Sequence, residues 1–396
     1  MERVVKTALD NMSIKNPQKA FIRLLLSVLV VVQGKANFRN MSRYCSMSEK
    51  RFSRWYRRPF AFYEFNTQAL FSELPHDSKY IAAIDASFMN KSGKHTEGLG
   101  MFYHGGSSKA ERGLELSLIS VVHLESETAY ALEAQQTIDQ KDKSRAEMYA
   151  DQVVSCAPDL IKRGILYLAA DAFYAKKSFV GPVANTGLHI VGKLRTDADL
   201  YWLFTGEYSG RGRPKKYDGK VDFVNDLDRF LYMGLLDENI EAYTAKTYSS
   251  CLKRIIRVVL LNVKKGNKIG RVLLFSTDVN LGGMTLIEYY KARFQIEFVF
   301  RDAKQHTGLM DCQSRKKEAI HTHINASLSA LNLLKLEDRC EKKEQGKTVI
   351  SITSWKRRKF NELLMCRIFE ELGLNLNDKK IMDTYKRLSR YGAIAA

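Results

Sequence analysis

Tyr80-Ile-Ala-Ala-Ile-Asp85-Ala-Ser-Phe88 is a short apolar run that one acid interrupts. Its length and composition predict a buried strand. A polar turn follows at 90–98, and further strands are expected at 99–103, 114–124 and 128–133. Strands this close in sequence usually pair with one another, so we expect an antiparallel group with Asp85 in its interior.

A second acid ends a similar run farther along the chain. The residues Ile165-Leu-Tyr-Leu-Ala-Ala-Asp171 predict a buried strand, between helices expected at 143–163 and 176–186, with another strand at 188–194. A run of strands followed by alternating helices and strands indicates a mixed α/β core.

The two acids need a physical explanation. Burying an unpaired carboxylate costs several kcal/mol, so Asp85 and Asp171 require a cation, a cage of hydrogen bonds or a place at the exposed end of the sheet. Acids at the ends of adjacent strands could jointly coordinate a hard divalent ion through oxygen. Aspartate at a strand end is also a common turn cap, so neither acid is decisive by itself.

A long helix is expected from about residue 285, and one of its faces is unusual. At about 100° per residue, Tyr290, Arg293, Glu297 and Lys304 share an arc of roughly 60°, and Arg301 adds a further cation beside it. A solvated face would scatter its charges, and a core face would be apolar. One acid among several donors suits a phosphodiester backbone with a metal at its centre.

These residues carry a resemblance to a known family. The stretch Tyr290-Lys-Ala-Arg293-Phe-Gln-Ile-Glu297-Phe-Val-Phe-Arg-Asp-Ala-Lys304 matches the Tyr-x2-Arg-x3-Glu-x6-Lys signature of DDE transposases from bacterial insertion sequences. Three other segments resemble the flanking motifs of that group in the same order: Ile84–Phe88, Ala170–Tyr174 and Phe275–Asp278. The resemblance covers roughly residues 35–335.

The resemblance implies a fold, a site and an activity. The fold would be α/β, a ribonuclease-H-like mixed-sheet catalytic core with a β-rich insertion and an N-terminal helical domain. Asp85, Asp171 and Glu297 would be catalytic and would bind two Mg²⁺ ions, for which Mn²⁺ could substitute, while Tyr290, Arg293 and Lys304 would hold phosphates. The enzyme would bind the terminal inverted repeats of its element, cleave them and join the 3′-OH ends to target DNA.

The same resemblance implies partners and a location. A homodimer would hold both element ends, in the bacterial cytoplasm and associated with the nucleoid. Trp202, in the expected insertion, could stack on an extruded base or simply pack in the core; packing is the simpler interpretation.

Composition favours a nucleic acid as partner, DNA or RNA, which is consistent with the double-stranded DNA that the resemblance implies, although a merely basic soluble protein would have the same composition. The 63 Lys and Arg outnumber the 44 Asp and Glu, a formal net charge of +19, and such an excess favours a polyanion. The six cysteines never form a Cys-x-x-Cys pair, which argues against a zinc ribbon and a disulfide framework. The most apolar stretch, 21–32, is short and carries Arg23, so we expect a buried helix there and no membrane span.

Basic residues gather in two further places. A short helix expected at 37–44 and a second after Ser48 suggest a helix-turn-helix-like DNA module, although a helical bundle with a solvated basic face would have the same pattern. The expected DNA contacts of the second helix are Arg51, Arg54, Arg57 and Arg58. A Gly/Pro-rich loop adds Arg211, Arg213 and Lys215, and Arg301 completes the expected DNA-binding set.

Together these patterns divide the chain into five parts. They are a helical DNA-binding domain at 1–75, the first part of the core at 76–196, the β-rich insertion at 197–268, the second part of the core at 269–340, and a basic helical tail at 341–396.

Other functions fit the sequence less well. A junction resolvase or ribonuclease of the same fold would not require the Tyr-Arg-Glu-Lys face or the basic N-terminal helices. A non-catalytic DNA-binding regulator would be expected to lack one of the three acids, and all three are present. A zinc site built from His306, His321 and His323 is disfavoured, because residues two apart on a helix do not share a face.

Overall fold

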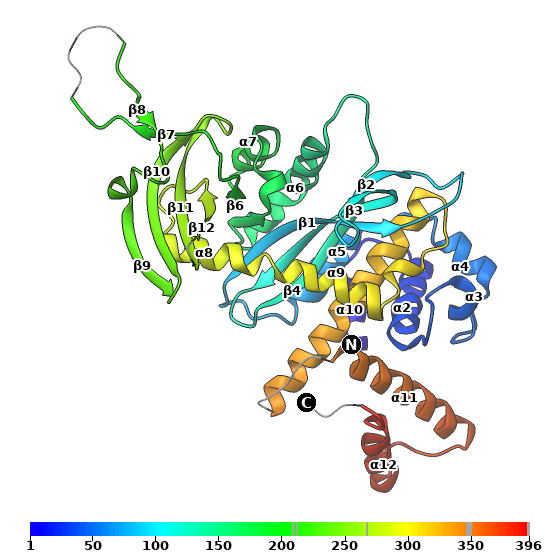
Figure 1. Cartoon of the computed structure of the whole chain (residues 1–396). Helices are drawn as coiled ribbons and strands as arrows, with labels where there is room; N and C mark the ends of the chain where they lie inside the picture. The colour runs from blue at the N-terminus through cyan, green and yellow to red at the C-terminus, as the bar shows by residue number, and fades with distance from the viewer. Residues whose placement is uncertain (208–209, 211–212, 267, 346–350, 394–396) are drawn as a thin grey trace.

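The computed structural model describes residues 1–207, 210, 213–266, 268–345 and 351–393, with the side chains of 342–345 excepted. The N-terminal part is helical (Figure 1). Its helices are α1 (Glu2–Asp10), α2 (Asn16–Val31), α3 (Phe38–Met41), α4 (Glu49–Trp55) and α5 (Phe62–Phe71). They share one continuous hydrophobic core with the sheet that follows, so they are fixed against it.

The sheet is mixed, as the sequence predicted. Its first strands are β1 (Tyr80–Asn90), β2 (Gly100–His104), β3 (Lys109–His123), β4 (Thr128–Gln136), β5 (Tyr167–Ala170) and β6 (His189–Leu194). β3 pairs antiparallel with β1 on one edge and with β4 on the other, while β5 is parallel to both β1 and β6. The central order β4-β3-β1-β5-β6, with three antiparallel strands followed by two parallel ones, is that of a ribonuclease-H-like core, and the expected fold is confirmed.

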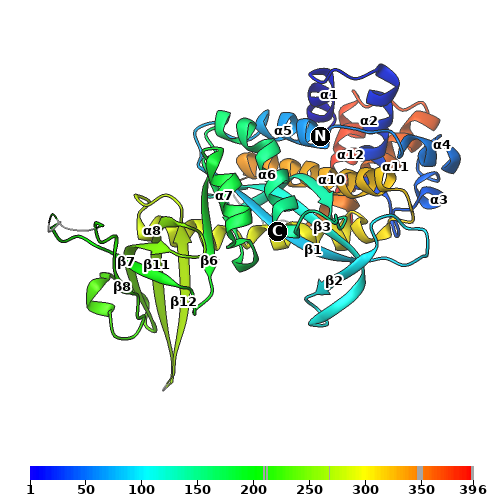
Figure 2. The same cartoon turned by 90° about the horizontal axis from the view of Figure 1, so that it is seen from above.

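The strands of the expected insertion extend this same sheet. They are β7 (Leu200–Leu203), β8 (Tyr217–Lys220), β9 (Leu231–Asp237), β10 (Ile240–Ser249) and β11 (Arg254–Lys265). β11 forms a hairpin with β12 (Lys268–Ser276), and β12 pairs antiparallel with β6. The green strands therefore lie to one side of the core in Figures 1 and 2, continuous with it.

Helices complete the core. α6 (Arg145–Lys162) and α7 (Lys177–Asn185) pack on each other, and α6 begins with a capping box between Ser144 and Glu147. α8 (Gly283–Ala292) packs on β5, β6, β11 and β12, whereas α9 (Gln295–His306) packs on β1, β3 and β4. The next helix, α10 (Lys317–Gln345), packs on β4, α2, α5 and α9.

The long helix expected from about 285 is thus two helices, and that prediction is corrected here. Between them, Ile296 N donates to Arg293 O and Glu297 N donates to Phe294 O. These are hydrogen bonds of the 3₁₀ type, between residues three apart, and they tighten the turn. Arg293 and Phe294 keep right-handed helical backbone angles, so the two helices follow nearly one line (Figure 1). The arc of about 60° expected for Tyr290, Arg293, Glu297 and Lys304 assumed one ideal helix, so it is approximate across this junction.

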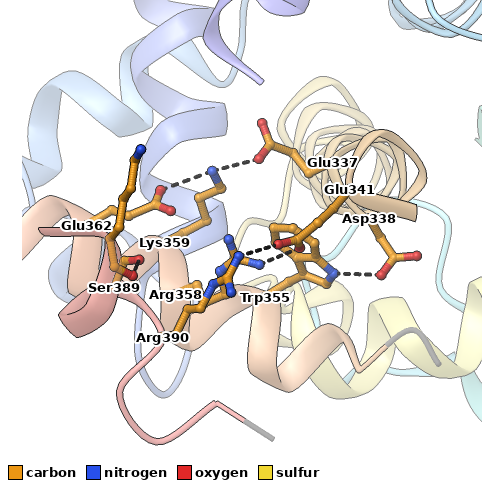
Figure 3. A network of polar contacts seen from close by, with 10 residues as sticks. Glu337, Asp338, Glu341, Trp355, Arg358, Lys359, Glu362, Ser389 and Arg390 are labelled. Carbon is orange, nitrogen blue, oxygen red and sulfur yellow. Dashed lines mark hydrogen bonds and ion pairs between the residues drawn. The ribbon is translucent and has the colours of Figure 1, made fainter. Parts of the chain in front are cut away.

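Two helices close the chain, α11 (Ile352–Glu371) and α12 (Lys379–Ser389). Figure 3 shows how they are attached to α10: Lys359 bonds Glu337 at 2.8 Å and Trp355 Nε1 donates to Asp338 Oδ1 at 2.9 Å. Glu341 binds a basic residue from each side, Arg358 of α11 and Arg390 just after α12. The terminal amino group also bonds Glu337. Because α10 continues past residue 340, the boundary expected there falls inside a helix.

None of the helices among the described residues combines the length and the apolar character that crossing a membrane requires.

Candidate active site

The strand register brings the first two acids together. In the parallel pair of β1 and β5, Ala83 lies opposite Ala169. Asp85 and Asp171 each stand two residues beyond that pair, Asp85 on β1 and Asp171 directly after β5, so the register places them side by side on chain segments that leave the pair about 4.8 Å apart. In β1 the residues Ile81–Ile84 are buried, and Asp85 is the first partly exposed residue after them. Both acids are therefore partly exposed, at the carboxyl-terminal end of β5 and beside it on β1.

An arginine connects the third acid to this edge. Arg293, at the α8–α9 junction, donates from Nη1 to Asp85 Oδ2 at 3.3 Å and from Nη2 to Glu297 Oε1 at 2.9 Å. The Arg293 and Asp85 side chains are 13% and 18% exposed, and that of Glu297 is 42% exposed. Glu297 therefore stands on the solvent side of the cluster, with the guanidinium between it and the strand acid.

The electrostatics of Asp85 reflect this crowding. Burial raises its pKa to about 6, Arg293 opposes the rise, and the carboxylates of Asp171 and Glu297 add to it. Both other acids thus lie close enough to affect Asp85, and they repel its charged form. Three mutually repelling carboxylates gathered around one buried position require positive charge, which Arg293 supplies.

Lys304 and Tyr290 flank the acids along the helices. Lys304 Nζ donates to Ser87 Oγ at 2.8 Å and to Phe88 O at 3.1 Å, next to Asp85 on β1, and burial lowers its pKa. The Tyr290 ring faces the Arg293 guanidinium at 5.9 Å, and burial raises the pKa of its hydroxyl. Arg301, by contrast, pairs with Asp302 and stacks on Phe298 at 4.4 Å. The structure brings Tyr290, Arg293 and Lys304 to the acids and directs Arg301 elsewhere.

Two residues at the site were not expected from the sequence. Ser87 receives the Lys304 ammonium, and its only sequence signal was its place in the Asp85 motif. Tyr174 follows Asp171 and is completely buried, and burial together with Asp85 raises the pKa of its hydroxyl well above the usual value. Its position behind both acids helps to explain why Asp85 is so desolvated.

The other predicted contact residues lie apart from the acids. Arg51, Arg54, Arg57 and Arg58 are exposed on or just after α4, where Arg58 stacks on Trp55 at 4.1 Å. Ser48 occupies the N-cap position of α4, but its side chain makes no capping hydrogen bond. In the insertion, Arg213 is exposed, Lys215 bonds Asp218 at 2.8 Å, and Arg211 lies outside the described residues.

Trp202 has the packing role. Its indole is 5% exposed, donates from Nε1 to Asp226 at 2.7 Å, and lies beneath the Arg229 guanidinium. Its ring also packs edge-on against Phe230 at 5.0 Å, so it is buried and hydrogen-bonded as a core tryptophan is.

The carboxylates have the right chemistry for a divalent ion but not yet the arrangement. Within the part of the chain that the structure describes, no three His, Cys, Asp or Glu side chains are positioned together as a metal site. Arg293 bridges two of the three acids. The oxygen donors, their burial and their mutual repulsion nevertheless fit a hard cation that would replace the guanidinium. His321 instead faces Glu133, and His323 bonds Gly308 O.

The sheet order and the acids that it gathers define a protein of ribonuclease-H-like fold. Residues 76–333 match the family described as Transposase DDE domain, and the chain belongs to this family. No curated protein matches it. Among solved structures, the chain is similar to a piggyBac transposase synaptic complex with hairpin DNA, at 12% identity and a TM-score of 0.45, covering 94% of this chain and 76% of that one. A second, weaker similarity is to the NurA nuclease from Sulfolobus solfataricus, at 9% identity and a TM-score of 0.26, covering 69% of this chain and 86% of that one.

Proposed function

We propose that this protein is a transposase that cuts and joins DNA with a single active site. It would bind the terminal inverted repeats of its own element, cleave the ends by metal-dependent hydrolysis and join the 3′-OH ends to target DNA. The observation that supports this best is the Asp85–Arg293–Glu297 bridge, with Asp171 directly after the adjacent strand, in a chain of the transposase family.

In this mechanism the three acids would hold two divalent ions, Mg²⁺ or in its place Mn²⁺. Bound ions supply the Lewis acidity that lowers the pKa of an attacking water and stabilises a leaving 3′-oxygen. Asp85 would hold them from β1, Asp171 from the position directly after β5, and Glu297 from α9. No covalent protein intermediate is needed, so the same site can use water or a DNA 3′-hydroxyl as nucleophile.

Arg293 changes partners in this mechanism. Before ions bind, its guanidinium neutralises Asp85 and Glu297. With the acids holding ions instead, the guanidinium would be free to form a bidentate contact with a backbone phosphate. Lys304, held on β1, and Tyr290 contribute donors to the same strand of DNA. We further propose a homodimer that holds both element ends, in the bacterial cytoplasm and associated with the nucleoid.

The decisive experiment is an end-cleavage assay. The protein is incubated with Mg²⁺ and a duplex that carries the terminal repeat found in the DNA flanking its gene, and the products are mapped. A transposase yields 3′-OH cuts at the repeat boundary and, with a target plasmid, joined products. Cutting without regard to the repeat would favour a general nuclease, and binding without cutting would favour a regulator.

The exposed arginines of α4 give a prediction for end binding. Replacing Arg54 and Arg57 by Ala should weaken binding and reduce the slope of log K against log[salt] by about 1.8, since each phosphate contact contributes about 0.9. Fluorescence anisotropy between about 50 and 200 mM salt measures both quantities. The matched control replaces exposed Lys6 and Lys162 by Ala and should leave the slope unchanged. An unchanged slope in the α4 variant would mean that this helix has only a solvated basic face.

The pKa of Asp85 predicts how metal binding depends on pH. Its carboxyl binds a proton more tightly in the folded protein, at about 6 against 3.8, so the metal-free protein loses stability as pH rises from about 4 to 6. Only the ionised form accepts a cation. At pH 5 about a tenth of Asp85 is ionised, so Mg²⁺ should bind about tenfold more weakly than at pH 7.5. Thermal shift titrations at the two pH values measure this, and Asp85→Asn should abolish the difference. Equal affinity at both would contradict a role for Asp85 as ligand.

A further inference from the structure

A cavity of about 370 Å³ lies at the C-terminal end of α9, which carries Lys304 and His306. Three segments distant in sequence line it: the residues just after α2, the end of α9, and the first turns of α11. We call it the basic pocket and define it by Lys35, Lys304, His306, Lys356 and Arg357. No part of the proposed chemistry uses it, apart from Lys304 at its edge.

The charge of the basic pocket is positive. Lys35, Lys304, Lys356 and Arg357 contribute cations, and Asp311 is the acid among the lining residues. The Asp311 carboxylate already accepts a hydrogen bond from Ala36 N at 2.8 Å, and this backbone donor stabilises its negative charge. Burial lowers the pKa of His306, which disfavours the charged form of its ring, so the ring is not counted among the cations. An anion entering the cavity would therefore meet a clear excess of positive charge.

Hydrogen bonds hold the Lys356 side chain in a fixed position in this pocket. Its Nζ donates to Val32 O at 2.9 Å and to His306 O at 2.6 Å, so it joins two walls of the cavity. An ammonium has three donors, and these carbonyls account for two of them. Burial lowers its pKa to about 8, which still leaves most of it charged at pH 7. A third donor held at a fixed position in a cavity suits a phosphate oxygen.

The attachment of α11 fixes the orientation of these cations. Trp355, Arg358 and Lys359 bind the acids of α10, as Figure 3 shows. Lys356 and Arg357 lie between them in sequence, and both line the basic pocket. Lys35 and Arg357 are exposed, so they border the cavity where a large ligand can reach them. The site is therefore preformed, and binding need not order the helix that carries it.

The position relative to the acids points to a polymeric ligand. Lys304 lines the basic pocket while its Nζ bonds Ser87 and Phe88 beside Asp85. At about 1.5 Å per residue, the end of α9 lies roughly 10–13 Å beyond Glu297. A DNA strand advances about 3.4 Å per nucleotide, so this span corresponds to about three or four nucleotides.

We propose that the basic pocket binds one backbone phosphate of the element-end DNA, about three or four nucleotides from the bond that is cut. This inference rests on the proposed function, because it assumes that DNA lies across the three acids. This phosphate contact would not depend on the DNA sequence. It would fix how many nucleotides of the element end lie beyond the three acids, and so the register of the DNA on the protein.

The test combines a protein variant with altered DNA. The variant replaces Lys35 and Arg357 by Gln, and the single Lys35→Gln variant serves if the double one melts at lower temperature. The probe is the terminal-repeat duplex with one phosphate at a time made neutral as a methylphosphonate, scanned along the strand. We expect one position, about three or four nucleotides from the cut, at which wild type loses about fivefold to tenfold in affinity and the variant loses less than twofold. On unmodified duplex the variant's salt slope should be lower by about 0.9, the contribution of one phosphate contact.

The control is the exposed pair Lys6→Gln with Lys162→Gln, which removes the same charge and should behave as wild type. If wild type cuts the ends but variant and wild type respond equally to every methylphosphonate, the pocket inference is overturned and the proposed function stands. If wild type neither binds nor cuts the terminal repeat, the proposed function fails and the inference fails with it.

Discussion

Replacing Glu297 by Gln should reduce cleavage of the element ends by at least about a thousandfold, which is roughly 4 kcal/mol of transition-state stabilisation. The amide keeps the shape of the side chain and can still accept from Arg293, but it lacks the charge that a divalent ion requires. End binding should change by less than about threefold, because Glu297 is proposed to contact ions and not phosphates. Product formation in gels and anisotropy on the same duplex measure the two effects separately.

Glu288→Gln is the matched control. Glu288 is exposed on α8, so the same change of charge on the neighbouring helix should leave cleavage within about twofold of wild type. Equal cutting by wild type and the Glu297 variant would remove Glu297 from the mechanism.

Replacing Arg293 by Gln should give the largest effect on stability. The change removes the cation that bridges Asp85 and Glu297 and leaves a largely buried carboxylate uncompensated. Breaking a buried pair costs about 3–5 kcal/mol, and the exposure of Glu297 places the expected loss near the lower end, about 3 kcal/mol. Denaturant unfolding in EDTA measures this loss. Added Mg²⁺ should restore stability, and it should stabilise the variant more than wild type, because no guanidinium has to be displaced.

Arg301→Gln provides the comparison. Arg301 is more than half exposed and pairs with Asp302, so its loss should cost less than about 0.5 kcal/mol and should not alter the response to Mg²⁺. A stable Arg293 variant with an ordinary Mg²⁺ response would show that the arginine does not hold the place of the ions.

The sheet could be predicted from sequence where local pattern determines it. Short apolar runs between turn residues located β1 and the strands after it, and the two strand acids stood out because they interrupt or end such runs. Their adjacency needs the register of β1 with β5, which hydrophobic pattern leaves open, since both strands are buried on both faces.

The helix that bears the third acid was predicted less completely. A helical wheel gives the direction of a side chain but not its partner, so it did not predict that Arg293 bonds Asp85 and Glu297, while the expected contact of Arg293 with phosphate stays a prediction. The break between α8 and α9 arises from three-residue hydrogen bonds at the junction, for which no Gly or Pro gave a signal. The basic pocket could not be anticipated at all, because its three walls are brought together only by tertiary packing.

The central claim is that Asp85, Asp171 and Glu297 together hold divalent ions. Anomalous X-ray diffraction from crystals of the protein with end DNA and Mn²⁺ tests it most directly. We expect Mn²⁺ peaks bound by oxygens of all three side chains, with the Arg293 guanidinium moved from the acids to a phosphate. The claim would be contradicted by a structure in which DNA lies across the acids while Mn²⁺ is bound elsewhere and Arg293 still bridges Asp85 to Glu297.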